Sequence, residues 1–352
     1  MLLKTMNSTK FAKNNRMSKI DLKYLSKELN LSVSTISRAL RDDWEISEKT
    51  KIRVRALAEE LNYTPNPYAS SLRRQSSQTI AVVIPEIANN FFTLVINGIE
   101  SVAREKNYHV LIYLTHEDYE RELSIINYFQ NGRTDGILMS VSVGTQDYAH
   151  LQEIHRNGMP IVFFDRVCPD IETTKIITDD FESSFKATEH LIKNGCHRIA
   201  CLSMTDHLSI EMKRKSGYLQ ALAKYDIPVN PEWIIESTND DPLSISKIRT
   251  LLTSSRKPCS VFATVEKLAI HTYDVCKELN INIPKKLKVI TFSNLTTAAL
   301  LNPSLTTITQ PAFEIGKQAA TVLFKHLDKK RFAIPNEDII LKSDLHIRNS
   351  TL

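Results

Sequence analysis

The sequence predicts an all-α head followed by an α/β body of two doubly wound parallel-sheet lobes, and three observations support this fold class. The stretch Ser18–Leu72 repeats short amphipathic helical patterns without a single glycine. From residue 80 onward, short apolar runs alternate with helical patterns. Residues 1–75 hold 15 Lys or Arg against 8 Asp or Glu, a net charge of +7, whereas the other residues hold 30 against 32, a net charge of −2. The basic balance is therefore confined to the head.

The first helix of the head carries Leu22, Leu25 and Leu29 on one face, at the i, i+3, i+7 spacing of an amphipathic helix. Asp21 is placed to cap its first amides, because a short carboxylate side chain accepts hydrogen bonds from them. Asn30 can take the left-handed turn that ends a helix, since asparagine tolerates that conformation better than most residues. These signals predict a helix that begins at about residue 22 and ends before Asn30.

A second helix follows, capped by Ser32, with Ile36 and Leu40 on its buried face. Its first turns leave four side chains exposed: Val33, Ser34, Ser37 and Arg38. Ser47 then precedes a third helix, whose inward-facing residues are Val54, Leu57, Ala58 and Leu61. This order fits a helix-turn-helix, whose second helix enters the major groove of DNA, and a basic head suits the same partner. An ordinary αα-hairpin is the alternative.

The body contains eight apolar runs that read as short strands, with helical patterns between them. The runs are Ile80–Ile84, Val110–Leu114, Gly136–Val141, Ile161–Phe164, Ile199–Ser203, Trp233–Ile235, Val261–Ala263 and Val289–Phe292. Doubly buried strands joined by helical crossovers indicate parallel sheets covered on both faces. Because eight such units exceed one ordinary open sheet, we expect two successive lobes. The stretch Arg73–Thr79 is the clearest linker.

Three segments of the chain closely resemble the LacI/GalR family of bacterial transcription regulators. They are LSVSTISRALRD, ISEKTKIRVRALAEELNYTPN and NPYASSLRRQSSQTIAVVIPEIANNFF, which are similar to the head, hinge and first core strand of that family. The resemblance covers nearly the whole chain and implies a periplasmic-binding-protein-like body, whose chain crosses between the lobes near residues 177, 308 and 337.

The domain boundaries follow from these patterns and from the resemblance. We expect a disordered basic extension at 1–16, a helix-turn-helix DNA-binding domain at 17–64, a hinge helix and linker at 65–79, and a two-lobed effector-binding and dimerisation domain at 80–349. Lobe 1 is expected at about 80–176 and 308–336, and lobe 2 at about 177–307 and 337–349. Met17, just before the family-like segment, is a second candidate for the initiator methionine.

The resemblance also implies roles for individual residues of the head and hinge. Val33, Ser34 and Arg38 occupy the positions that contact bases, where an arginine suits bidentate contact with guanine. The phosphate-contacting positions are Ser32, Thr35, Ser37, Tyr63 and Asn66. Leu72 corresponds to the hinge-helix leucine that wedges into the minor groove.

Candidate effector-binding residues follow the ends of predicted strands, where ligands bind to open parallel sheets. Phe91 and Phe92 follow the first strand, Asp165 and Arg166 follow the fourth, and Arg214 lies in the helix after IACLS. The resemblance makes all five effector candidates, with aromatic faces for a sugar ring and charged groups for its hydroxyls. Core packing is the alternative for the two phenylalanines, and a solvated surface is the alternative for the basic run around Arg214.

Two positions of the second lobe depart from the family pattern. The chain has Val265-Glu266 where the family usually has Asn-Asp, and Ser293-Asn294 where it usually has an aspartate. Glu266 and Ser293 are therefore further effector candidates. With Asp165 as the only expected carboxylate on the first lobe's side, the pocket should be less acidic than is common, which favours an anionic sugar. Glu266 favours a neutral sugar instead, because its carboxylate would repel an anion.

Composition and motifs exclude several other classes of protein. The first sixteen residues hold no apolar run of signal-peptide length, which argues against export and against a secreted solute-binding protein. The five cysteines have no Cys-x-x-Cys spacing, so we expect reduced thiols and no zinc site. The eight glycines form no G-x-G-x-x-G or P-loop pattern, and no H-E-x-x-H or G-x-S-x-G motif is present. We therefore expect no enzyme activity, no metal and no cofactor.

The sequence thus predicts a cytoplasmic transcription regulator, with repression as its expected action. It should bind a partly palindromic operator in double-stranded DNA as a homodimer, and respond to a small-molecule effector, a sugar or sugar derivative, held between the lobes. The alternatives are a carbohydrate-binding or carbohydrate-processing protein without a regulatory role, and a nonspecific DNA binder.

Overall fold

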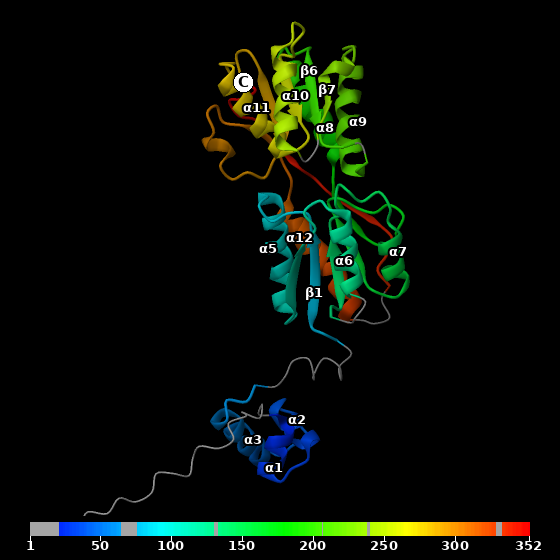
Figure 1. Cartoon of the computed structure of the whole chain (residues 1–352), viewed down its shortest axis with the longest axis vertical. Helices are drawn as coiled ribbons and strands as arrows, with labels where there is room; N and C mark the ends of the chain where they lie inside the picture. Colours follow the sequence, from blue (N-terminus) through cyan, green and yellow to red (C-terminus); the bar gives the residue numbers. More distant parts are fainter. Residues whose placement is uncertain (1–20, 65–75, 130–132, 206, 238–239, 329–332) are drawn as a thin grey trace, which may run out of the picture. The chain divides into compact units, whose positions relative to one another are not determined.

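The computed structural model describes residues 21–64, 76–129, 133–205, 207–237, 240–328 and 333–352. The chain divides into two compact units, a head that ends at Gln75 and a body that starts at Ser76 (Figure 1). The expected extension at 1–16, Met17, and the hinge segment with Asn66 and Leu72 lie outside the described residues. Each unit is described by itself.

The head packs helices α1 (Leu22–Leu29), α2 (Val33–Leu40) and α3 (Glu48–Glu60) around a small apolar core. The core consists of Leu25, Ile36, Ala39, Val54 and Ala58. The three expected caps are present, because Asp21, Ser32 and Ser47 each accept a hydrogen bond from an amide of the first helical turn that follows. Asn30 ends α1 in the left-handed conformation, with φ 52°, as predicted.

The first lobe of the body contains a six-stranded parallel sheet in the order β11-β5-β4-β3-β1-β2. Its strands are β1 (Thr79–Ile84), β2 (His109–Leu114), β3 (Gly136–Met139), β4 (Ile161–Phe164), β5 (Lys175–Thr178) and β11 (Asp338–Leu341). Its helices are α5 (Asn90–Glu105), α6 (Tyr119–Phe129), α7 (Ala149–Arg156) and α12 (Ala312–Asp328).

Strand β1 shows why this sheet carries helices on both faces. Ile80, Val82 and Ile84 point into the core formed with α5 and α12, whereas Ala81 and Val83 point into the core formed with α6 and α7. Because all five are buried, the strand reads as a continuous apolar run rather than an alternating one.

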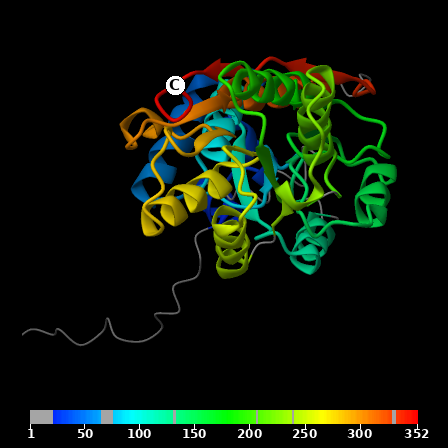
Figure 2. The same ribbon diagram turned by 90° about the horizontal axis from the view of Figure 1, so that it is seen from above.

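The second lobe repeats this architecture with one antiparallel edge strand. Its sheet has the order β12-β10-β9-β8-β6-β7, and β12 runs antiparallel to β10. The strands are β6 (Ile199–Ser203), β7 (Ile234–Glu236), β8 (Ser260–Ala263), β9 (Lys288–Phe292), β10 (Thr306–Thr309) and β12 (Asp344–His346). The helices are α8 (Asp180–Lys193), α9 (Ser209–Lys224), α10 (Asp241–Thr253) and α11 (Glu266–Glu278), with short 3-10 turns at Pro231–Trp233 and Ala298–Leu300. The view from above shows the C-terminal strands, in red, along one edge of the body (Figure 2).

Helices α5 and α12 approach each other unusually closely because glycines lie at their contact. A β-carbon added at Gly98 of α5 would lie 2.0 Å from the carbonyl oxygen of Phe313, and one added at Gly316 of α12 would lie 2.0 Å from that of Val95. Neither distance is sterically possible. The pair therefore depends on hydrogen as the side chain at both positions.

The chain crosses between the lobes three times, at residue 179, at residues 310–311 and at residues 342–343. The crossing segments are hydrogen-bonded to one another. Gln310 donates to the hydroxyl of Thr178 at 3.1 Å, and the backbone amide of Ser343 donates to the carboxylate of Asp179 at 2.8 Å. The expected third crossing near residue 337 is wrong, because β11 comes after it and still pairs with β5 of the first lobe.

The fold class is confirmed, with an all-α head and a body of two doubly wound lobes. Each of the eight predicted strands is present, and both of its ends lie within two residues of the predicted ends. The described residues also contain β5, β10, β11 and β12, which the apolar pattern did not reveal. None of the helices in the described residues is both long and apolar enough to cross a membrane.

Candidate functional site

Helix α2 presents the side chains that the sequence assigns to DNA. Ser32 accepts a hydrogen bond from the amide of Thr35 at 3.1 Å, and its hydroxyl also contacts the hydroxyl of Ser34 at 2.7 Å. Val33 adds an exposed apolar side chain to this turn. The first turn of α2 thus combines small hydroxyls, one apolar side chain and the unpaired amides of a helix start.

Arg38 lies one turn further along the same exposed face. Its guanidinium forms an ion pair with Glu45, a residue of the loop between α2 and α3, and about half of each side chain is exposed. Ser37 and Tyr63 are half-buried beside this surface. The structure therefore brings the described candidates for DNA contact together on α2, its cap and the residues just after α3.

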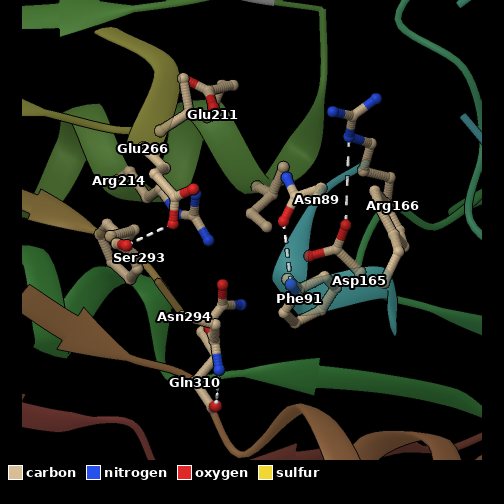
Figure 3. Close-up of a pocket in the computed structure, with 14 residues that line it drawn as sticks. Asn89, Phe91, Asp165, Arg166, Glu211, Arg214, Glu266, Ser293, Asn294 and Gln310 are labelled. Carbon is tan, nitrogen blue, oxygen red and sulfur yellow. Dashed lines mark hydrogen bonds and ion pairs between the residues drawn. The ribbon is translucent and has the colours of Figure 1, made fainter. Parts of the chain in front are cut away.

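The body contains a pocket of about 500 Å³ that opens to solvent between the two lobes. Its lining residues follow the carboxyl ends of strands from both sheets, as expected for open parallel sheets. All seven effector candidates line it: Phe91, Phe92, Asp165, Arg166, Arg214, Glu266 and Ser293. Figure 3 shows Asp165 and Arg166 of the first lobe on one side and Arg214, Glu266 and Ser293 of the second lobe on the other.

Arg214 is the most constrained side chain of the pocket. Its Nε donates to the carboxylate of Asp180 at 2.8 Å, and its Nη1 donates to the carbonyl oxygen of Thr264 at 2.6 Å. The guanidinium lies 3.7 Å from the ring centre of Phe292, close enough for a cation–π contact. Its Nη2 is buried and has no hydrogen-bond partner in the part of the chain that the structure describes. A buried donor of this kind calls for a ligand oxygen or an ordered water.

Glu211 lies on the same helix, one turn before Arg214, and the sequence analysis missed it. It is 2% exposed and accepts hydrogen bonds from the hydroxyl of Thr264 at 2.6 Å and from the amide of Met204. Burial raises its pKa, against the effects of Arg214 and of these hydrogen bonds. The three-residue spacing from Arg214 is the signal that could have found it, since residues at i and i+3 share a helix face.

The first-lobe side of the pocket is built around Asp165 and Arg166. Asp165 has a φ of 60°, a left-handed conformation that turns the chain sharply after β4. Burial raises its pKa to about 6, although the neighbouring Arg166 and Arg214 lower it. Arg166 donates from Nη1 to both carboxylate oxygens of Glu117, at 2.8 and 2.9 Å.

A buried network beneath this side holds Glu117 and the loop after β3 in place. Glu117 accepts a hydrogen bond from the amide of Val143 at 2.8 Å. Glu122, which is fully buried, accepts one from the amide of Ser142 at 2.9 Å and contacts His150 Nε2 at 3.0 Å. Because adjacent amides of one loop are bound by two carboxylates, the position of Arg166 is fixed through Glu117.

The second-lobe side carries the two positions that depart from the family pattern. The Ser293 hydroxyl donates to the Glu266 carboxylate, and the same hydroxyl accepts the amide of Leu295 at 3.0 Å. Burial raises the pKa of Glu266, and the charge of Glu86 on the first lobe adds to the rise. Asn294 donates to the carbonyl of Gln310 at 2.7 Å, while its side-chain oxygen is buried without a partner among the described residues.

The lining of the pocket holds one carboxylate that the sequence analysis missed, Glu211 of the second lobe. Asp165 is the only first-lobe carboxylate in the lining, as expected, but Arg166 beside it is paired with Glu117. Arg214 is likewise paired with a carboxylate, Asp180, which no sequence pattern indicated. Both arginines thus already have an anionic partner, which reduces their attraction for an anionic ligand.

The two phenylalanines combine the two roles that the sequence left open. Phe91 and Phe92 are 6% and 2% exposed and belong to the core between β1, α5 and α12, yet both line the pocket. Their rings meet edge to face at 5.2 Å. The remaining lining residues, which the sequence did not indicate, are Asn89, Ile210, Glu211, Val265, Phe292, Asn294 and Gln310. Among the described residues, no group of three or more His, Cys, Asp or Glu side chains is arranged to hold a metal ion.

Two family models match the chain. Residues 26–66 match the model described as "Bacterial regulatory proteins, lacI family", and residues 188–351 match "Periplasmic binding protein-like domain". Together they span more than half of the chain, and they cover most of the head and most of the second lobe, together with α12 and β11 of the first lobe.

Relatives of known name and structure extend the match to nearly the full length. The HTH-type transcriptional repressor CytR of Escherichia coli is 29% identical over 330 residues, which cover 94% of this chain and 96% of CytR. A LacI family transcriptional regulator from Enterococcus faecium, solved with bound ribose, is 25% identical with a TM-score of 0.67, covering 78% of this chain and 98% of that one. The lac repressor dimer bound to operator and the anti-inducer ONPF has a TM-score of 0.81 at 20% identity, covering 95% of this chain and 100% of that one, and it supports the fold.

Proposed function

Because the chain belongs to the lacI family of bacterial regulatory proteins and is a DNA-binding transcription regulator, we propose that it is a repressor controlled by a neutral, hydroxyl-rich effector bound between its lobes. Its relatives are transcriptional repressors, so it is a regulator and not an enzyme. We propose that it acts in the bacterial cytoplasm, where its DNA partner lies.

The head supports the DNA-binding half of this proposal. We assign base contacts to Val33, Ser34 and Arg38, and phosphate contacts to Ser32, Thr35, Ser37, Tyr63 and Asn66, with Leu72 as the minor-groove wedge. The described members of these sets lie on α2, its cap and the end of α3, the elements that meet DNA in a helix-turn-helix.

A homodimer follows from the same proposal, since a two-fold symmetric protein matches a palindromic operator. The body supports it with an unusual edge strand. Leu111 and Ile112 of β2 are 44% and 39% exposed, at an edge of the first-lobe sheet that no other described strand covers. An exposed apolar edge strand favours aggregation unless a partner covers it.

The observation that carries the effector assignment is the set of polar atoms around the pocket. Arg214 offers a buried, unpartnered donor, Asn294 a buried, unpartnered acceptor, and Asp165 and Glu266 offer carboxylate oxygens. Vicinal hydroxyls can donate to carboxylates and accept from arginine at the same time, so a sugar satisfies both kinds of partner. A carboxylate or phosphate would meet Asp165, Glu211 and Glu266 with no unpaired cation to balance them.

A thermal-stability panel tests this assignment. Neutral sugars, uronates and sugar phosphates are each added to the protein, and a ligand at about 100 times its dissociation constant stabilises the folded state by roughly 2.7 kcal/mol. We expect only a neutral sugar to stabilise the protein. Arg214→Lys should abolish it, because lysine keeps the charge beside Asp180 but loses the planar fork.

The matched control is Arg249→Lys, which alters an exposed ion pair with Glu278 on the same lobe and should leave ligand binding unchanged. Preferential stabilisation by an acidic sugar, or full stabilisation of the Arg214→Lys protein, would overturn the assignment.

A further inference from the structure

Two of the five cysteines lie side by side at the amino-terminal edge of the second-lobe sheet. Cys196 precedes β6 by three residues, and Cys259 comes directly before β8. Strands β6 and β8 are neighbours in register, with Ile199 opposite Ser260. The pocket lies at the other end of these strands, because Glu266 follows the carboxyl end of β8.

The two cysteines are close neighbours across these strands. The sulfur of Cys196 lies 3.9 Å from the carbonyl oxygen of Cys259, and each thiol is the largest influence on the pKa of the other. The amide of Cys259 donates to the carbonyl of Arg198 at 2.8 Å, which fixes the backbone on one side of the pair. The Cys259 sulfur lies 3.3 Å from that same carbonyl, which accepts its S–H while the thiol is protonated.

The two thiols differ in character. Cys196 is 4% exposed, whereas Cys259 is half-buried and can be reached from solvent. The neighbouring Cys196 thiol holds the pKa of Cys259 below that of an ordinary thiol, and backbone groups and the charge of Arg198 lower it further against the effect of burial. The Cys259 thiol in turn raises the pKa of Cys196. Thiolate character and access together make Cys259 the reactive member.

The other three cysteines provide an internal comparison. Cys168, Cys201 and Cys276 are each at most 2% exposed. Burial raises the pKa of Cys168 to about 11 and that of Cys276 to about 12. Buried thiols of high pKa react slowly with oxidants, so selective oxidation of one pair is chemically possible.

We propose that Cys196 and Cys259 form a dithiol that hydrogen peroxide converts into an intramolecular disulfide. In the first step the Cys259 thiolate attacks one peroxide oxygen. The S–O bond forms, the O–O bond breaks, and hydroxide leaves and is protonated, so that the sulfur is oxidised by two electrons to a sulfenic acid. In the second step the Cys196 sulfur attacks the Cys259 sulfur. The S–S bond forms, the S–O bond breaks, and the departing hydroxide takes the Cys196 proton as water. One peroxide is thus reduced to two waters for each disulfide.

The bridge would enclose residues 196–259, which include β6, α9 and β7. Helix α9 carries Glu211 and Arg214. Oxidation therefore cross-links the segment that supplies Glu211 and Arg214 to the pocket, from the opposite end of the sheet and without filling the pocket. This modification site does not depend on the identity of the effector.

Mass spectrometry of the full-length protein tests the proposal. The reduced protein is treated with a small excess of hydrogen peroxide, then denatured and alkylated without reductant. We expect three alkylated cysteines instead of five, an unalkylated mass lower by about 2 Da, and a peptide pair linked through Cys196 and Cys259. Thiol reductant should restore all five sites.

Single substitutions distinguish the roles of the two sulfurs. Cys196→Ser should leave a sulfenic acid at Cys259 that dimedone captures, whereas Cys259→Ser should leave Cys196 reduced at the same peroxide dose. Cys276→Ser is the matched control and should form the same disulfide as the unaltered protein. Circular dichroism melting confirms that each variant is folded.

Three outcomes would overturn the proposal. They are five alkylated thiols after peroxide treatment, sulfinic acid at Cys259 of the unaltered protein with no linked peptide, and a linkage that joins two chains rather than two residues of one chain.

Discussion

Arg38 is held by an ion pair before it meets any partner. In the head its guanidinium contacts Glu45 across the loop between α2 and α3, and both side chains remain partly exposed. An exposed ion pair is worth about 0–1 kcal/mol, less than a bidentate contact to guanine at about 1–3 kcal/mol. Contact between Arg38 and a base would therefore replace the ion pair. Glu45 orients the guanidinium but binds it too weakly to prevent that contact.

Replacing Arg38 tests base contact directly. Arg38→Ala should weaken binding to the preferred operator by about 1–3 kcal/mol and remove the preference at one base pair, while affinity for unrelated DNA changes much less. Competitive gel shifts with operators altered at each position measure both effects. An equal loss on all sequences would reassign Arg38 to a phosphate. Arg104→Ala, at an exposed position of α5 in the body, should change neither.

Asp165 makes the stability of the body depend on pH. Burial raises its pKa from an ordinary 3.8 to about 6, so the folded protein binds this proton more tightly than the unfolded chain. Such a group stabilises the fold fully below its unfolded pKa, and the contribution is lost as the pH rises through 6. The difference amounts to roughly 2 kcal/mol between pH 4 and pH 7.

The Asp165→Asn protein should lack this contribution. Its urea unfolding curves, measured from pH 4 to pH 8 beside those of the unaltered protein, should show a smaller gain in stability on acidification. Asp180, Glu211 and Glu266 also have raised pKa values and act in the same direction in both proteins, so the difference between the two curves isolates Asp165. Parallel curves would show that Asp165 titrates normally.

At the scale of elements, the contact of α5 with α12 joins the start of the first lobe to the segment that returns from the second. Helix α12 follows the crossing at residues 310–311, and its glycine contact with α5 leaves no room for adjustment. Close-packed helices transmit a shift rather than absorb it. The pair is therefore a rigid unit that any relative motion of the lobes must move as a whole.

Gly98→Ala tests this packing. The new methyl group would meet the Phe313 carbonyl, so the helices must separate, at a cost of about 1–3 kcal/mol from overpacking. Chemical denaturation measures the loss. Asn97→Ala, at the adjacent exposed position of α5, is the control and should stay within about 0.5 kcal/mol of the unaltered protein. Equal stability of the two variants would contradict the close approach.

Local sequence patterns predicted the strands that consist of an apolar run. They missed the strands without such a run, which join a sheet by pairing with a neighbouring strand. Strand β10 reads TTIT and β12 reads DLH, so neither shows an apolar run. Strands β11 and β12 are separated by residues 342–343 alone, yet they belong to different sheets. The spacing of apolar residues does not indicate which of the two sheets a strand joins. The third crossing was therefore predicted before β11 instead of after it.

The pocket shows the same division between local and long-range information. Its seven predicted residues were found because they follow strand ends or match family positions. The pairing of Asp180 with Arg214 joins residues 34 positions apart, and that of Glu117 with Arg166 joins residues 49 apart. These pairs decide the charge of the pocket, and spacing along the chain does not encode them.

At the scale of the whole molecule, the three crossings are the only covalent connections between the lobes in the described body, and they are hydrogen-bonded to one another. A ligand that contacts both lobes therefore favours one arrangement of the body over others. If DNA also favours one arrangement, the two ligands are linked, and each changes the affinity for the other by the same factor.

The expected linkage is a change of about 5- to 150-fold in operator affinity when the effector is saturating. Fluorescence anisotropy of labelled operator, titrated with protein at zero and saturating effector, measures this factor. Arg214→Lys should bind operator normally without effector and should lose the response to it. A factor of one for the unaltered protein, with binding of the effector independently demonstrated, would show that the pocket does not regulate DNA binding.

Strands β11 and β12 have a consequence for synthesis of the protein on the ribosome. Each is an edge strand of a different lobe, and both come from residues 338–346, after every other strand of either sheet. Neither lobe can complete its sheet until this part of the chain has been translated. The head has its own core within residues 25–58 and needs no later residue to form it. A nascent chain can therefore present a folded head before it has a body able to respond to an effector, so control by the effector begins only after residues 338–346 have been translated.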